Sequence, residues 1–156
     1  MRQPWVAAIA AAEKNVDNRA RSLGPYRGPI AIHAGNAWSC SGAVDPRVVD
    51  LFGWYPNRGD ELKFPRGAIV AVGELVDSHH PDDCARADGT SCSRWADRML
   101  GDTPVRAHLV LADVRALLDP IPWPGALGLW TIPEHLERVL HLNPTELAEP
   151  TGRTRP

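Results

Sequence analysis

The sequence has no apolar run that approaches the ~18–20 residues needed to span a membrane. It also lacks a basic segment followed by a long apolar stretch and a small-residue cleavage site, so no signal peptide is visible. Basic residues are not in excess: 17 Lys and Arg stand against 19 Asp and Glu, a net charge of -2. This balance argues against a protein that binds mainly through non-specific attraction to phosphate, although it allows a local basic cleft.

Cysteine and lysine are both scarce. The three cysteines, Cys40, Cys84 and Cys92, are an odd number. Without an export signal they indicate intracellular thiols and not a disulfide scaffold, and we expect a cytoplasmic protein. Lys14 and Lys63 are the only lysines, so each is a candidate for a specific role.

What the chain does have is the length and composition of one domain. Its 156 residues are 44% hydrophobic and 23% charged, close to the globular average, and can bury a core without disulfides. We expect a domain over residues 1–142, with an inserted polar loop at 78–104, and a polar tail over 143–156.

Hydrophobic patterning and turn residues predict short elements. Helices are expected at 5–13, at 46–52 between an Asp45 cap and a Gly53 stop, and at 133–142. Strands are expected at 15–20, 30–34, 67–77, 107–112 and 127–131, with a stiff proline-rich connection at 119–124. Few elements alternate as βαβ, so we predict an α+β fold: a small, mixed, mostly antiparallel β-barrel with peripheral helices.

Four segments of the chain, in order, resemble the ASCH domain family, whose members have a PUA-like barrel. The first combines RQPW (2–5) with a K-x-x-D-x-R motif formed by Lys14, Asp17 and Arg19, and the others are YRGPIAIHAG (26–35), RGAIV with ELVD (66–77), and PIP with GALGLW (120–130). The family signature is G-x-K-x-x-E-x-R, so Ala12 replaces its glycine and Asp17 its glutamate. The resemblance covers about residues 2–132.

The resemblance implies an RNA- or nucleotide-binding module that recognises a base or phosphate in a cleft lined by Lys14, Asp17 and Arg19. The alternatives that it implies are an amidohydrolase that removes the acetyl group from acetylcytidine, a ribonuclease, or a protein-interaction module. For the hydrolase, Lys14 would be an activated amine or proton shuttle, Asp17 or Glu74 the general acid/base, and Arg19 the substrate anchor. The partner would be RNA or a modified pyrimidine nucleoside. The substrate-binding candidates besides Arg19 are Gln3, Trp5, Tyr26 and His33.

The signature also has a physical interpretation of its own. On a strand over 15–20, side chains alternate, so Val16 points into the core and Asp17 and Arg19 share the other face. Lys14 at the preceding turn is expected to lean over that face, giving a small cluster of two cations and one anion that can hold a phosphate or the polar edge of a base. Trp5, Tyr26 and Trp38 could supply a stacking surface. The plainer alternative is a solvated surface ion pair.

Glu74 and His33 each have two interpretations. Glu74 lies near the apolar part of its strand, where burial would raise its pKa and favour acid/base catalysis, but a solvated carboxylate at a strand end explains it equally well. His33 lies in an apolar strand, where a histidine that hydrogen-bonds backbone is favoured over one that borders a cleft.

The loop after residue 78 contains weak candidates for a metal site. His79, His80, Cys84 and Cys92 are residue types that suit zinc. Their spacing does not match a standard finger or ribbon, and a flexible loop with incidental thiols is the favoured alternative. The sequence thus predicts no cofactor, with zinc as the minority possibility.

Overall fold

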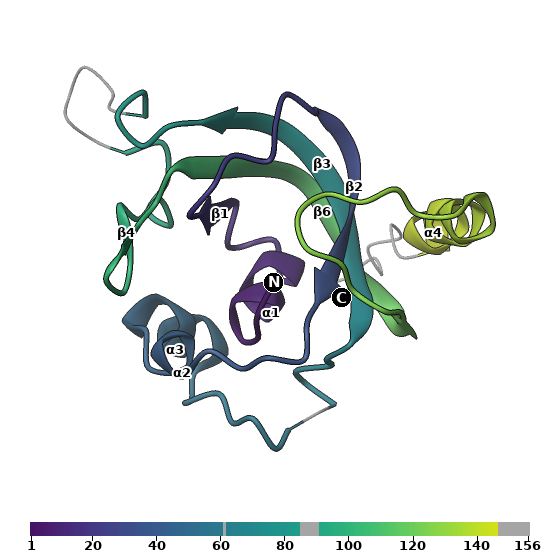
Figure 1. Cartoon of the computed structure of the whole chain (residues 1–156). Coiled ribbons are helices and arrows are strands. Elements are labelled where there is room, and N and C mark those ends of the chain that lie inside the picture. The colour runs from purple at the N-terminus through teal and green to yellow at the C-terminus, as the bar shows by residue number, and fades with distance from the viewer. Residues whose placement is uncertain (61, 85–90, 147–156) are drawn as a thin grey trace, which may run out of the picture.

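The computed structural model describes residues 1–60, 62–84 and 91–146, with side chains up to residue 140. Four strands form one curved antiparallel sheet, and four helices lie around it (Figure 1). The helices are α1 (Trp5–Ala10), α2 (Cys40–Ala43), α3 (Pro46–Phe52) and α4 (Glu134–Glu146). The sheet strands are β1 (Val16–Arg19), β2 (Gly28–Ala34), β3 (Ala68–His79) and β6 (Ala107–Pro122), and a separate small pair is β4 (Met99–Leu100) with β5 (Thr103–Pro104).

The sheet order is β1-β6-β3-β2, which confirms a mostly antiparallel α+β fold. In the described residues β1 and β2 do not pair with each other, so the sheet does not close into a barrel. Register shifts interrupt the β3–β6 ladder at three places. Each shift bends and twists the strands, and the sheet curves around α1 (Figure 1).

Three apolar clusters hold the helices and connections on the sheet. The largest lies between α1 and the concave side and includes Val6, Ile9, Ile32 and Leu109. A second packs Leu136 and Leu140 of α4 against the opposite side of the sheet. The third surrounds Trp95 of the β3–β6 connection, which packs against Val16 and Val48. The predicted inserted loop therefore contributes a fully buried tryptophan to the core.

Several predicted elements differ from those observed, and the helix predicted at 5–13 already ends at Ala10. Residues 127–131 form no strand, and instead they lie beside the sheet as an irregular segment. Residues 119–122, predicted as a stiff connection, are the end of the long strand β6. The prolines fit there because they lie at the strand end, where Pro122 pairs with Ala68 and the next amide, Trp123, donates to Gly67. Helix α4 also continues to Glu146, past the predicted start of the tail; residues 147–156 lie outside the described part of the chain.

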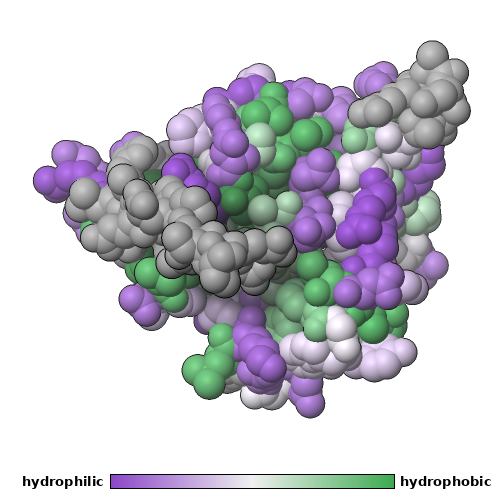
Figure 2. Space-filling model, turned by 180° about the vertical axis from the view of Figure 1, so that it is seen from behind, coloured by the Kyte–Doolittle hydropathy of each residue, from purple (hydrophilic) through white to green (hydrophobic). Residues whose placement is uncertain are grey.

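The surface has an uneven distribution of apolar groups. Figure 2 shows apolar side chains gathered in a hollow strip between polar ones on the face turned away in Figure 1. No helix in the described part of the chain is long and apolar enough to cross a membrane.

Candidate functional site

The signature lysine, Lys14, is enclosed within the protein. Its side chain donates to the carbonyl of Val16, and its ammonium lies 5.6 Å and 5.5 Å from the ring centres of Trp5 and Trp95. Lys14 is 4% exposed. Burial lowers the pKa of Lys14 to about 8, although the carboxylates of Asp17 and Asp97 oppose this shift. Roughly a tenth of such an amine is neutral at pH 7.

Asp17 and Arg19 lie on one face of β1, with Val16 and Asn18 on the other, as the alternation predicts. Arg19 Nε donates to Asp17 Oδ2 at 2.5 Å, and both side chains are partly exposed. In the described residues Lys14 makes no ion pair with Asp17. The signature is therefore a partly exposed ion pair beside an enclosed cation, and the structure does not place all three groups in one open cleft.

The segment that covers Lys14 is fixed by two polar clamps. Asn18 Nδ2 donates to the Trp95 carbonyl at 2.9 Å and to Asp97 Oδ2 at 3.1 Å. Arg47 of α3 donates to Asp97 and to the Arg94 carbonyl, and its guanidinium lies 5.0 Å from the Trp95 ring centre. Trp95 is thus held against Lys14 by contacts from β1 and α3.

Several predicted binding residues have structural partners. The Gln3 amide donates to the Pro65 carbonyl and accepts from the Ala7 amide, and Gln3 is 1% exposed. Trp5 Nε1 donates to Ser39 Oγ at 3.0 Å. His33 is half-buried and its Nε2 donates to the Trp123 carbonyl at 2.8 Å, which is the backbone-binding role that the sequence favours. Trp38 packs edge-on against Phe64.

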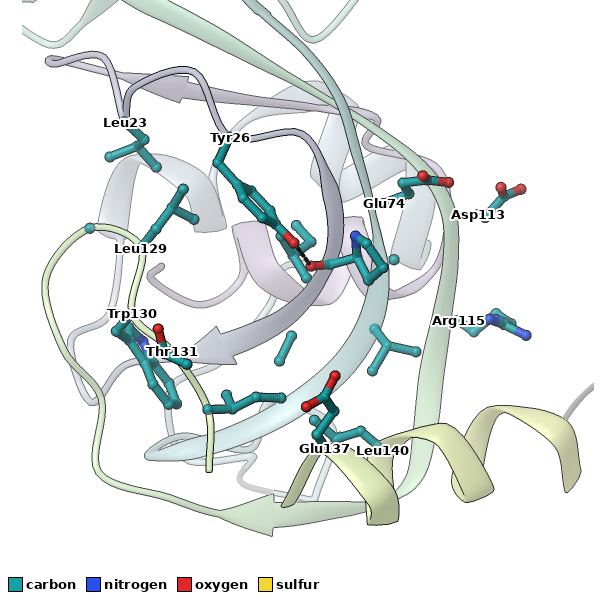
Figure 3. A pocket seen from close by; sticks show the side chains of 17 residues that line it. Leu23, Tyr26, Glu74, Asp113, Arg115, Leu129, Trp130, Thr131, Glu137 and Leu140 are labelled. Carbon is teal, nitrogen blue, oxygen red and sulfur yellow. Dashed lines mark hydrogen bonds between the residues drawn. The ribbon is translucent and has the colours of Figure 1, made fainter. Parts of the chain in front are cut away.

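A groove of about 800 Å³ lies between the sheet, helix α4 and the irregular segment before it. It is lined by Leu23, Tyr26, residues 29–31, 72–74, Asp113, Arg115, residues 128–132, Glu137 and Leu140. Figure 3 shows Tyr26 pointing into the groove, Trp130 on one wall, and Glu74, Asp113 and Arg115 together on the side of β3 and β6. Of the predicted site residues, Tyr26 and Glu74 both line this groove.

The aromatic wall of the groove is supported by contacts of its own rings. The Trp130 ring stacks parallel on Trp123, with centroids 6.5 Å apart and planes 5° apart. Tyr26 is 44% exposed, and its hydroxyl donates to the Pro29 carbonyl at 2.6 Å. A flat ligand could contact both Tyr26 and Trp130 while these contacts keep the rings in place.

A β-bulge positions the charged wall. Val72 pairs with Arg115 and Glu74 with Ala112, so β6 carries one extra residue at this point. Asp113 has a φ of 49°, in the left-handed region that non-glycine residues rarely adopt. Gly73 opposite is closely packed, because a Cβ there would lie 3.1 Å from the Ala112 carbonyl oxygen. Bulges commonly re-aim side chains next to functional sites.

A second candidate site is a group of metal-binding side chains, here called the metal cluster: His79, Cys84, Cys92 and His108. Each offers one ligand atom, and these atoms all lie within 4.8 Å of one another. His79 and His108 are cross-strand partners at the ends of β3 and β6, and the two cysteines come from the connection between these strands. The metal cluster could bind a metal ion.

The weak sequence prediction therefore contained three of the four side chains. His80 is outside the metal cluster and lies 3.3 Å from the Asp82 carboxylate. His108, which the sequence reasoning missed, takes its place. The detectable signal was a lone histidine in the apolar run AHLVLA, but only the register of β3 and β6 shows that it meets His79.

The metal cluster has electrostatics that favour thiolate. Burial alone would raise the pKa of Cys84, but the nearby polar groups of Cys92, His79 and His108 outweigh it and lower the pKa to about 6. The three cysteines form no disulfide in this structure.

No protein-family model matches the chain, and no curated protein matches it significantly.

Proposed function

We propose that the protein binds a base or nucleoside of RNA in the groove, as a distant relative of the ASCH and PUA-like proteins that its sequence resembles. The observation that carries the proposal is one groove with two aromatic rings, Tyr26 and Trp130, beside the polar groups Glu74 and Arg115. A base needs a flat stacking surface and hydrogen-bond partners for its edge.

The charges in the groove favour a nucleoside over a chain of phosphates. In the described part of the chain, Glu74, Asp113 and Glu137 line it together with one arginine, Arg115. A carboxylate accepts hydrogen bonds from exocyclic amino groups of bases, whereas it repels phosphate. Among the described residues, Glu74 has no ion-pair partner that would compete with such a ligand.

The test is a titration of the protein with cytidine, acetylcytidine, uridine and short single-stranded RNA. Replacing Trp130 with Ala should weaken nucleoside binding by roughly 1–3 kcal/mol, as expected for loss of a stacked base. Tyr55→Ala is the matched control, since Tyr55 is 69% exposed and lies outside the groove. Equal affinities for wild type and Trp130→Ala, or no binding of any of these ligands, would overturn the proposal.

An amidohydrolase that uses water to release acetate from acetylcytidine is the second candidate. The lowered pKa of Lys14 favours it, because a partly neutral amine can take a proton or attack an amide. Trp5 and Trp95 enclose that amine, so the reaction would require the Trp95 segment to move. Acetate release that vanishes in Lys14→Met would support this function, and equal release in that variant would exclude the assigned role of Lys14.

Two further parts of the proposal concern cofactor and compartment. The metal proposed for the metal cluster is zinc, which would act as a structural element outside the groove. The cytoplasm is the proposed compartment, since free thiols persist in reducing surroundings.

A further inference from the structure

The metal cluster already has nearly the dimensions of a metal-binding tetrahedron. Zinc–sulfur bonds of about 2.3 Å and zinc–nitrogen bonds of about 2.0–2.1 Å give tetrahedral edges of roughly 3.3–3.8 Å. Cys92 Sγ lies 3.7 Å from His108 Nδ1, within that range. The four ligand atoms lie no more than 4.8 Å apart, so small side-chain adjustments would bring all of them to one ion.

In each of the two histidines, one ring nitrogen already donates a hydrogen bond. The other ring nitrogen is therefore free to bind a metal. His79 Nδ1 lies 2.7 Å from Asp77 Oδ2 and donates to it, since a carboxylate accepts. His108 Nε2 donates to the Asp97 carbonyl at 2.9 Å. The lone pairs of His79 Nε2 and His108 Nδ1 therefore remain available to a metal. Metal-binding histidines commonly have such a carboxylate or carbonyl partner.

One atom of the metal cluster is buried without any partner. His79 Nε2 is inaccessible to solvent and makes no hydrogen bond. A buried polar atom left in this way is costly, and a metal ion would satisfy it. The Cys92 amide also donates to Cys84 Sγ at 2.9 Å, a contact that stabilises a metal-bound thiolate.

We propose that His79 Nε2, Cys84 Sγ, Cys92 Sγ and His108 Nδ1 bind one zinc ion in a closed tetrahedral site. Two thiolates and two neutral imidazoles are a structural zinc set, and together they neutralise the charge of Zn²⁺. Because the protein fills all four positions, no position is left for water or substrate, and the role of the ion is structural.

The position of the site explains what the zinc stabilises. Antiparallel neighbours such as β3 and β6 can be joined by a very short turn, yet here the connection runs from His80 to Arg106. It carries Trp95 onto Val16 and over Lys14. Zinc would fasten the start and middle of this connection to the sheet, as a third anchor beside the clamps made by Asn18 and Arg47.

The primary experiment measures metal in the wild-type protein purified without chelator. We expect about one zinc per chain, and a cobalt-substituted protein with a thiolate-to-metal charge-transfer band and the strong visible bands of tetrahedral Co²⁺. One thiol, Cys40, should react quickly with a disulfide reagent, and the other two only after chelation. The proposal would be overturned by less than about a tenth of a zinc per chain after incubation with excess Zn²⁺. It would also be overturned if all three thiols reacted freely, or if Cys84 and Cys92 formed a disulfide in a reducing buffer.

Matched variants separate ligands from bystanders. His108→Ala and Cys92→Ser should lose stoichiometric zinc, while His80→Ala and Cys40→Ser should keep it. Since a ligand variant could fail to fold, Asp77→Asn supplies a milder test: it keeps all four ligands, and its zinc affinity in a chelator competition should fall about 10–100-fold. Asp82→Asn is its control. Unchanged affinity in Asp77→Asn together with retained zinc in His108→Ala would contradict the assigned ligand set. These outcomes are independent of nucleoside binding.

Discussion

Lys14 is the residue whose environment departs most from what its sequence motif predicts. Two indole rings and a backbone carbonyl surround its ammonium. Rings of this kind attract a cation through their electron-rich faces, and the charge is thereby tolerated at a site where burial disfavours it. The signature lysine is thus part of the packing between α1, β1 and the Trp95 segment.

The lowered pKa of Lys14 gives a stability that depends on pH. The pKa is about 8 in the folded protein and 10.5 in an exposed lysine, so between these values the unfolded chain binds more protons. The free energy of unfolding must therefore rise with pH from about 8 to 10.5, by about 3 kcal/mol in total. Urea unfolding of wild type and Lys14→Met at several pH values measures this, and the variant should lack the rise.

The control for this prediction is Lys63→Met. Lys63 is exposed and pairs with Asp60, so this variant retains Lys14 and should retain the rise. If the free energy of unfolding of Lys14→Met rises as much as that of wild type over the same pH range, a group other than Lys14 causes the rise.

At the scale of single elements, helix α3 links its own cap to the segment over Lys14. The Asp45 side chain accepts from the Arg47 amide at 2.9 Å, and the Arg47 guanidinium bridges Asp45 and Asp97. The hydrogen bond from the Arg47 side chain is the main cause that lowers the pKa of Asp45. The Asp45 carboxylate thus caps α3 and also orients Arg47, which binds Asp97.

Replacing Asp45 with Ala should lower the free energy of unfolding by about 1–2 kcal/mol, the usual cost of a lost N-cap. Asp45→Asn is the matched variant: it can still cap the helix but loses the ion pair, so it should be affected less at pH 7. Because the folded pKa of Asp45 is lowered, the advantage of wild type over Asp45→Asn should disappear as the pH falls below the folded pKa. Equal stabilities of the Ala and Asn variants at pH 7 would argue against the cap.

The irregular segment that bears Trp130 is attached to the sheet at Gly125. A Cβ at this position would lie 2.6 Å from His33 Cε1, and His33 itself binds the Trp123 carbonyl. Gly125→Ala should therefore displace the segment and weaken nucleoside binding several-fold with an intact sheet. Gly59→Ala is the control, since the nearest atom there is 3.4 Å away. Circular dichroism and the nucleoside titration measure the two effects, and unchanged binding in Gly125→Ala would contradict the proposed attachment.

Local signals in the sequence predict elements well where one residue fixes the backbone. Helix α3 has its predicted bounds because Asp45 caps it, Pro46 occupies its first turn, and Gly53 ends it with a φ of 73°. The two faces of β1 also follow from alternation alone. The strand predicted at 127–131 is wrong because this segment joins no ladder: only Trp130 packs on α4 and the sheet, while Leu127 and Leu129 are exposed.

The sites depend on long-range pairing that no local pattern reveals. His79 and His108 meet only because β3 and β6 pair in one particular register. Lys14 is enclosed only because Trp95, 81 positions further along the chain, folds back onto β1. The motif around Lys14 identifies a group of charged residues but not how exposed they are. The exposure of Lys14 is set by the Trp95 segment, which the sequence pattern predicts to be a polar loop.

For the molecule as a whole, charge decides between a nucleoside site and an RNA-backbone site. The chain carries a net charge of -2, and the groove has carboxylates at Glu74, Asp113 and Glu137 against Arg115. A protein that neutralises several phosphates of a single strand releases counterions, and its affinity falls with a slope of roughly 0.7 per phosphate in a plot of log affinity against log salt. A stacked, uncharged nucleoside releases none.

Binding of cytidine or acetylcytidine should therefore change by less than about twofold between 50 mM and 500 mM salt, since no phosphate contact contributes. Single-stranded RNA should bind no more than about tenfold more tightly than the nucleoside at low salt, and Arg115→Gln should reduce that small advantage. The same titration with Arg58→Gln is the control, because Arg58 lines a separate depression that has no lining residue from α4. A steep salt dependence that Arg115→Gln leaves unchanged would place the RNA contact on another surface, and the groove would then have no part in recognising the backbone.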